Sequence, residues 1–248
     1  MSQLTGDERA RYVHNVFGGI AGRYNLMNRL MTAGQDIRWR RETIGRLGLR
    51  LGERLLDLGA GTGDLGREAL RQQPGIRLVA ADFSLAMMLA GQASAALPWL
   101  NADALHLPFP DGSFDAVVSG FLLRNVGNLS AALQEQYRIL KPDGRMLILE
   151  TTRLQHGLFS PLVRFHMHVL IPWIGGLVSG DQEAYRYLPA SSEAFLSAEE
   201  LAGRMVSTGF LKVGFCRRMF GTIAIHWGRK IITPESPFGI NRNTCTAD

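Results

Sequence analysis

Short apolar runs alternate with helical segments between residues 54 and 150, and this alternation constrains the fold more than any other feature. The runs RLLDL, IRLVAADFS, FDAVVSGFLL and RMLILE have the length and apolar character of buried strands. The segments DLGREALRQQ, SLAMMLAGQASAAL and LSAALQEQYRILK have helical spacing, and Ser84 is expected to cap the second of them. Strands joined by helices of this length form βαβ units, so the sequence predicts an α/β fold around a parallel sheet.

The segments on either side of this region have other patterns. Residues 1–50 predict a helical cap, because apolar residues recur at three- and four-residue spacing on one face: Phe17, Ile20, Ala21, Tyr24, Met27, Leu30 and Met31. After a helical insertion at 151–195, SAEELAGRMV carries a Ser197–Glu200 capping box and ends at Gly209. Two last strands follow, KVGFCRRMF and TIAIHWGRK. We therefore expect a cap, a main domain over 51–230 and a disordered tail over 231–248.

Composition excludes several classes of protein. Cys216 and Cys245 lie far apart, which gives neither a disulfide framework nor a zinc pattern, and we expect no metal site. The polar start MSQLTGDERARY lacks the apolar core of a secretory signal, and Arg164 and Pro172 interrupt the most apolar stretch, so we expect a cytoplasmic protein. The net charge of +5 comes without a basic run or a basic–aromatic tract, so no nucleic acid is expected as a partner.

The stretch DLGAGTGD, Asp57 to Asp64, joins the first predicted strand to a helix. Glycines there let the backbone close on a nucleotide-type ligand outside the carboxyl ends of the strands. The loop lacks the Gly-Lys-Ser/Thr of a P-loop, and Gly59, Gly61 and Gly63 depart from the G-x-G-x-x-G of dinucleotide folds. The two aspartates flank the loop with no nearby cation to neutralise a pyrophosphate. This charge favours a cofactor with an ammonium and a sulfonium, S-adenosylmethionine.

Two further carboxylates follow the next predicted strands. Asp82 lies about 20 residues after the loop, where an acidic residue accepts hydrogen bonds from ribose hydroxyls. Asp103 is placed to accept from the adenine amino group, and Ala104 to offer its N–H to the ring. Thr62 adds a hydroxyl within the loop. Two structural alternatives stay open, with Asp57 as a cap of the following helix and Asp103 as a turn residue.

Several segments resemble, in order, the signatures of the ubiquinone/menaquinone biosynthesis C-methyltransferases (the UbiE/MenG type). They are DLGAGTGD, ADFSLAMM, LPFPDGSFDAVV, FLLRNV, YRILKPDGRMLILE, SGDQEAYRYL and IAIHWGRK, with VFGGIAGRYNLMNRLMTAGQDIRWRR near the start. The glycine and LPFPDGSFD blocks occur across many class I methyltransferases. The RNV segment, the opening block and YRYL are more discriminating.

The resemblance implies a Rossmann-like fold whose seven-stranded, mostly parallel sheet has an antiparallel last strand. It implies methyl transfer from S-adenosylmethionine to a ring carbon of a lipophilic polyprenyl quinol in respiratory quinone biosynthesis. The cofactor contacts that it implies are Thr62, Asp82, Asp103, Ala104 and the backbone of Gly120, where the family often has Ser. Asn25 in place of Asp, and Leu122 in place of Gly, depart from the family pattern near the expected substrate, which leaves benzoquinol and naphthoquinol open.

A ring carbon becomes nucleophilic when an attached hydroxyl loses its proton, so the site must remove that proton or stabilise a quinolate. Arg124 and Asn125 follow the fourth predicted strand and are expected to point toward the cofactor rim. Arg124 stays protonated, so we assign it to stabilising the oxyanion or polarising a water that Asn125 orients. Tyr24 and Asn28 are expected to face the acceptor, and His106 is a weaker candidate base. The structural alternatives are an ion-pair role for Arg124 and a core position for Tyr24.

The apolar insertion leaves its partner open. Residues 159–178, with Arg153 and Arg164 nearby, suit burial of a prenyl chain or peripheral contact with the inner face of a membrane, and equally suit core helices or a homodimer. Two other functions stay open. One is methylation of another lipophilic acceptor, such as a phospholipid amine, a sterol or a polyketide phenol. The other is a catalytically silent scaffold that binds S-adenosylmethionine.

Overall fold

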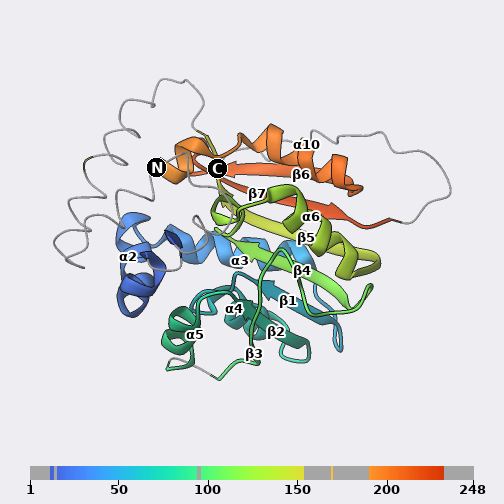
Figure 1. Cartoon of the computed structure of the whole chain (residues 1–248), viewed down its shortest axis with the longest axis horizontal. Helices are drawn as coiled ribbons and strands as arrows, with labels where there is room; N and C mark the ends of the chain where they lie inside the picture. Colours follow the sequence, from blue (N-terminus) through green and yellow to red (C-terminus); the bar gives the residue numbers. More distant parts are fainter. Residues whose placement is uncertain (1–11, 14–15, 94–95, 154–168, 170–189, 232–248) are drawn as a thin grey trace.

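The computed structural model describes residues 12–13, 16–93, 96–153, 169 and 190–231 (Figure 1). Their centre is one sheet of seven strands in the order β3-β2-β1-β4-β5-β7-β6. All neighbouring strands pair in parallel except β7, which is antiparallel to both β5 and β6. The predicted fold class is therefore confirmed. The strands are β1 (Arg54–Leu58), β2 (Arg77–Asp82), β3 (Trp99–Asn101), β4 (Phe114–Gly120), β5 (Leu140–Thr151), β6 (Leu211–Arg218) and β7 (Ile223–Arg229).

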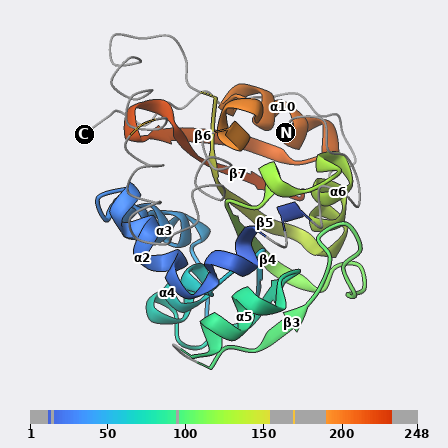
Figure 2. The same ribbon diagram turned by 60° about the vertical axis from the view of Figure 1, so that its left-hand side comes forward.

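Helices cover both faces of the sheet (Figure 2). On one face α3 (Gln35–Leu47) and α4 (Asp64–Gln72) bury Trp39, Ile44 and Leu65 against the strands. On the other face α6 (Leu129–Ile139) and α10 (Ala198–Thr208) bury Leu133 and Leu201. The strands are buried from both sides, which explains their nearly continuous apolar runs.

The predicted helical cap is divided into shorter pieces. A 3-10 turn, η1 (Ala21–Arg23), separates the helical residues 16–20 from α2 (Tyr24–Met31). Ile20, Met27 and Met31 are buried together, as predicted, but Leu30 is 44% exposed. The prediction that Leu30 shares the buried face is wrong, because Met27 and Met31 lie one helical turn apart on the buried side of α2 and Leu30 lies to one side of them.

Local capping signals predicted the helix ends well. Ser84 caps α5 (Leu85–Gln92) by accepting the Met87 N–H, and Ser197 and Glu200 form the predicted capping box of α10. Gly209 ends α10 in a left-handed conformation, with φ 110°. The helix through LSAALQEQYRILK ends earlier than predicted, at Ile139, because β5 begins at Leu140. Within β5, Asp143 has a φ of 63°.

Two predicted segments lie outside the described residues. Most of the insertion at 151–195 and almost all of the tail at 231–248 fall in ranges 154–168, 170–189 and 232–248. The domain boundaries therefore stay a prediction. Two short 3-10 turns, η2 (Leu123–Asn125) and η4 (Met219–Gly221), follow β4 and β6, and residues 190–194 are also helical.

Candidate functional site

A cavity of about 560 Å³ lies at the carboxyl ends of the central parallel strands. The last residues of β1, β2 and β4, which are Leu58, Asp82 and Gly120, all line it. Tyr24 of α2 and Asn125 of η2 also belong to its wall. Ligands of open α/β sheets bind outside the strand ends, so this cavity is the candidate site.

The glycine loop lets the backbone form the floor of this cavity. Gly59 and Gly61 line it and have φ values of 67° and 57°, in the left-handed region that side chains disfavour. A Cβ at Gly61 would lie 3.3 Å from Met87 Cε, and a Cβ at Gly59 would lie 2.8 Å from Leu122 Cδ1. Both positions therefore require glycine. Leu122, which departs from the family pattern, packs directly on the loop.

Asp82 lies in the cavity wall at the end of β2, as predicted. Its Oδ2 accepts the Gly61 N–H at 2.7 Å, and its Oδ1 accepts the Ser84 N–H at 2.7 Å. These bonds fix the carboxylate between the glycine loop and α5.

Asp103 and Ala104 also line the cavity. Asp103 is a turn residue as well, since its Oδ1 accepts the Leu105 N–H at 2.9 Å and its carbonyl accepts the His106 N–H at 3.1 Å. The turn and the binding position are thus compatible. The His106 side chain is 86% exposed, 3.7 Å from Asp103 Oδ2, and does not belong to the cavity wall.

Asp57 lies beneath the glycine loop rather than in the cavity wall. It is fully buried, and its Oδ2 accepts the Gly66 N–H in the first turn of α4 at 2.8 Å, so the capping alternative describes its position. Among the described residues, Asp57 Oδ1 meets no hydrogen-bond donor. Burial raises the pKa of this carboxyl to about 7, against the Gly66 bond. The cofactor-binding role of Asp57 stays a prediction, and Asp57 would influence the cofactor through the glycine loop and not by direct contact.

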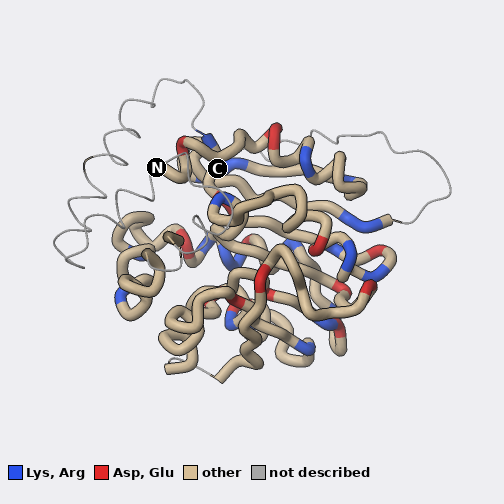
Figure 3. The backbone as a smooth tube through the Cα atoms, in the orientation of Figure 1, with Lys and Arg blue, Asp and Glu red and all other residues tan. Residues whose placement is uncertain are grey.

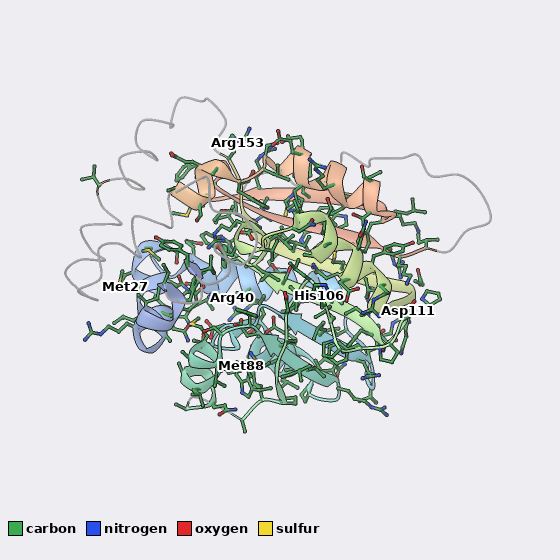
Figure 4. The ribbon with its side chains drawn as sticks, viewed as in Figure 1. Met27, Arg40, Met88, His106, Asp111 and Arg153 are labelled. Carbon is green, nitrogen blue, oxygen red and sulfur yellow. The ribbon has the colours of Figure 1, made fainter. Side chains whose placement is uncertain are left out.

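The loop is not without cations, which corrects the sequence argument. Arg67 Nη2 donates to Asp64 Oδ1 at 2.8 Å, and Arg40 Nη1 lies 3.5 Å from Asp64 Oδ2. In Figure 4 Arg40 lies above Met88 of α5 and to the right of Met27 of α2. Asp64 is therefore neutralised by arginines, and the carboxylates in the cavity wall are Asp82 and Asp103.

Thr62 is buried and points away from the cavity wall, toward the cap. Its hydroxyl donates to Asn25 Oδ1 of α2 at 2.8 Å. The position of the Thr62 side chain thus does not support the cofactor contact that the family resemblance implies. Asn25, which replaces the usual Asp, contacts the loop instead.

Arg124 also lies outside the cavity wall. It is 5% exposed, and its guanidinium pairs with the buried Glu150 at the end of β5. The guanidinium also lies over the Phe121 ring, 5.3 Å from its centroid. The expected direction toward the cofactor rim is therefore wrong for Arg124, because the charge has a partner inside the sheet. The ion-pair alternative describes its position.

Asn125 and Tyr24 do lie in the cavity wall. Asn125 Nδ2 donates to the Phe121 carbonyl at 3.0 Å, which fixes the side chain. The Tyr24 ring packs edge-on against Phe17 at 5.9 Å, so it serves the cap core and the cavity together. Asn28, expected beside it, does not line the cavity.

Part of the cavity wall is apolar, which the strand and helix patterns of the sequence do not predict. Phe83, Met87 and Leu105 line it. Phe83 directly follows Asp82 and is also exposed. An apolar residue directly after a predicted ligand-binding carboxylate is the sequence signal for this position.

His226 and Cys216 are buried and do not belong to the cavity wall. Burial lowers the pKa of His226 to about 4, so the ring is neutral, with Nε2 3.0 Å from the Ala198 carbonyl. In the described part of the chain no cluster of metal-ligating side chains occurs. The described helices include none with the length and hydropathy needed to span a bilayer.

Comparison with known proteins identifies the family. The sequence profile of the ubiE/COQ5 methyltransferase family matches residues 4–230. This chain belongs to the ubiE/COQ5 methyltransferase family. A ubiquinone/menaquinone biosynthesis C-methyltransferase UbiE of Desulfotalea psychrophila is 42% identical over 88% of this chain and 90% of its own. A demethylmenaquinone methyltransferase of Thermus thermophilus is 42% identical over 86% of this chain and 99% of its own.

Solved structures agree on the fold. A SAM-dependent methyltransferase of Thermotoga maritima, described as a possible histamine N-methyltransferase, has a TM-score of 0.62 and 19% identity, covering 87% of this chain and 98% of its own. The protein is a methyltransferase of this family, and its cofactor is S-adenosylmethionine.

The described cavity fits that cofactor. Gly61 has a φ of 57°, which disfavours a side chain, so the bare backbone of the loop faces the cavity and suits close approach of a ligand. Asp82 and Asp103 provide two carboxylates in one wall. Acidic groups without a phosphate-binding lysine suit a cationic ligand.

Proposed function

We propose that this methyltransferase transfers a methyl group to a ring carbon of a polyprenyl quinol in respiratory quinone biosynthesis. The observation that supports it is a single cavity whose wall combines Asp82 and Asp103 with apolar side chains, Phe83, Met87 and Leu105. The carboxylates suit the cofactor, and the apolar wall suits a lipophilic ring. The names of the Desulfotalea and Thermus relatives point to the same class of substrate.

The bound cofactor supplies an electrophilic methyl group on a sulfonium. The chain must hold the acceptor ring in line with it, since alignment of the reacting atoms lowers the barrier. We assign Tyr24 and Asn125 to contact the acceptor hydroxyl, because both lie in the cavity wall. Arg124 acts on the acceptor through the wall segment 121–125, which its pairing with Glu150 and its contact with Phe121 hold in place.

Labelled S-adenosylmethionine should transfer its methyl group to demethylmenaquinol or to the equivalent benzoquinol. A phospholipid amine, a sterol and a polyketide phenol are the competing acceptors in the same assay. Transfer to one of these and to no quinol would contradict the proposal. Cofactor binding without transfer to any acceptor would support a silent scaffold. Deletion of the gene should lead to accumulation of the demethylated quinone.

We further propose that the protein works at the inner face of the membrane and contacts it through α5. Phe83, Leu85 and Leu89 are exposed, and Phe83 also belongs to the cavity wall. No charged residue occurs from position 83 to 102, and Figure 3 shows α5 without charged residues. A cavity of about 560 Å³ has the size that encloses one drug-sized ligand. A long prenyl chain would therefore leave the cavity along this uncharged surface.

Vesicles containing phosphatidylglycerol test this contact by co-sedimentation. The double substitution Leu85→Glu and Leu89→Glu should lower the sedimented fraction. The control is Leu51→Glu, because Leu51 is 78% exposed and precedes β1, at the amino ends of the parallel strands and so opposite the cavity. Equal sedimentation of the three proteins would overturn the contact. A homodimer dissociated by the α5 substitutions would instead assign the surface to a second copy of the chain.

A further inference from the structure

One side chain of the cap is bonded to two residues of the glycine loop. Asn25 Oδ1 accepts the Thr62 hydroxyl at 2.8 Å, and Asn25 Nδ2 donates to Asp64 Oδ1 at 3.4 Å. Because a carboxylate only accepts, the amide nitrogen has to face Asp64, and the amide oxygen then faces Thr62. The amide is therefore held in one orientation. We call these three residues the clasp.

A neighbouring arginine holds the loop side of the clasp. Arg67 Nη2 donates to the Thr62 carbonyl at 2.7 Å and to Asp64 Oδ1 at 2.8 Å. Both loop residues that Asn25 contacts are thus fixed by the same guanidinium. Arg67 therefore ties Thr62 and Asp64 to each other, and their position constrains Asn25 at the start of α2.

The clasp connects the two sides of the cavity through neighbouring residues. On the cofactor side, Gly61 precedes Thr62, lines the cavity and donates its N–H to Asp82. On the acceptor side, Tyr24 precedes Asn25 and lines the cavity. A short covalent and hydrogen-bonded path therefore runs from Asp82 through Gly61, Thr62 and Asn25 to Tyr24.

We propose that Asn25 is a positioning residue that couples the cofactor loop to Tyr24, so that an ordered loop holds α2 and Tyr24 in place for the acceptor. The inference rests on the proposed function only for what Tyr24 contacts. Coupling between two sites is reciprocal for binding free energies, so an acceptor that orders Tyr24 raises the affinity for the cofactor by the same factor.

Hydrogen exchange tests the coupling without any acceptor. S-adenosylhomocysteine, the product form of the cofactor, should slow amide exchange in α4 and also in α2 of the wild type. In Thr62→Val and Asn25→Ala the slowing in α4 should persist, and the slowing in α2 should fall between about twofold and tenfold, as expected for the loss of one hydrogen bond. Full slowing in α2 of both variants would overturn the proposal.

Two variants separate positioning from general destabilisation of the cap. Thr32→Val removes a hydroxyl that bonds within the cap, to the Asn28 carbonyl and to Asp36, so it should leave the ligand-induced slowing in α2 unchanged. Asn25→Asp keeps an acceptor for Thr62 but removes the donor to Asp64 and sets a second carboxylate beside it, so it should lose at least as much of the slowing as Asn25→Ala. Loss of the slowing in Thr32→Val, or full slowing in Asn25→Asp, would overturn the role of the clasp.

Acceptor kinetics distinguish this inference from the proposed function. If quinol is the substrate, Asn25→Ala should raise the KM for quinol and lower kcat more than it weakens cofactor binding. If no quinol is methylated, the proposed function fails, while the exchange experiment still decides whether the loop and α2 are coupled.

Discussion

Replacing Asp57 by Asn should remove a pH dependence that this buried carboxyl imposes on folding. Burial is the largest cause of its raised pKa of about 7, and repulsion from Asp82 and Asp64 adds to it, against the bond from the Gly66 N–H and the attraction of Arg40. An amide keeps an acceptor for Gly66 and removes the charge. The substitution therefore tests the charge and not the shape of the side chain.

The magnitude follows from the difference between the folded and unfolded pKa values. A folded chain whose carboxyl has the higher pKa binds more protons between the two values, so its free energy of unfolding falls as pH rises through that window. An unfolded Asp titrates near ~3.9, so the window runs from about pH 4 to about pH 7. A difference of about 3 units corresponds to a loss of about 4 kcal/mol, complete above pH 7 and absent below pH 4.

Urea unfolding of both proteins across this pH window measures the effect. The free energy of unfolding of Asp57→Asn minus that of the wild type should rise with pH and become constant above about pH 7. Since the lost carboxylate lies below the cofactor loop, the variant should also bind S-adenosylmethionine more weakly at high pH. Greater stability with weaker binding is a common trade-off at functional sites.

A second aspartate serves as the control with the opposite sign. Burial tends to raise the pKa of Asp115, but hydrogen bonds from the Arg54 N–H and the Lys141 ammonium hold it below its usual value. Asp115→Asn should therefore become more destabilising as pH rises. A stability difference for Asp57→Asn that does not change with pH would refute the reasoning about the buried charge.

Three further predictions test the walls of the cavity. Asp82→Asn should weaken binding of S-adenosylmethionine about tenfold in calorimetry, because charged acceptors form the stronger hydrogen bonds, and unchanged affinity would contradict its role. Gly120→Ser should destabilise the protein by about 1–3 kcal/mol, because the added Cβ would lie 2.8 Å from Leu65 Cδ1, and Leu65→Val should restore the melting temperature. Glu150→Ala should cost about 3–5 kcal/mol in urea unfolding, since it leaves the buried Arg124 guanidinium without its carboxylate, and a loss under 1 kcal/mol would contradict the pairing.

Sequence reasoning was accurate where the signal is local. The strand–loop–helix of DLGAGTGD, the Ser84 cap and the Ser197–Glu200 box each depend on residues within one turn of each other. Asp82 and Asp103 were placed correctly because parallel strands bring their carboxyl ends to one edge of a sheet.

The errors concern which polar and charged side chains contact each other. The pairing of Arg124 with Glu150 joins β5 to η2, and no local spacing predicts it. The bond between Thr62 and Asn25 also joins distant segments. Arg67 is different, because it follows Asp64 at the i,i+3 spacing that brings helix side chains together. That spacing alone predicts the ion pair of Arg67 with Asp64.

The position of β7 has a consequence for synthesis on the ribosome. The strands whose ends line the cavity, β1, β2 and β4, precede β5 in the sequence, and β5 adds the last parallel strand beside β4. The parallel part of the sheet can therefore form once β5 has been translated. The other edge of β5 is covered by β7, which is translated only after the long segment that follows Thr151 and after β6. An uncovered strand edge invites pairing with other chains. The nascent protein therefore completes its binding site early and its protection from aggregation late, so chaperone demand should be greatest while residues 152–222 are being translated.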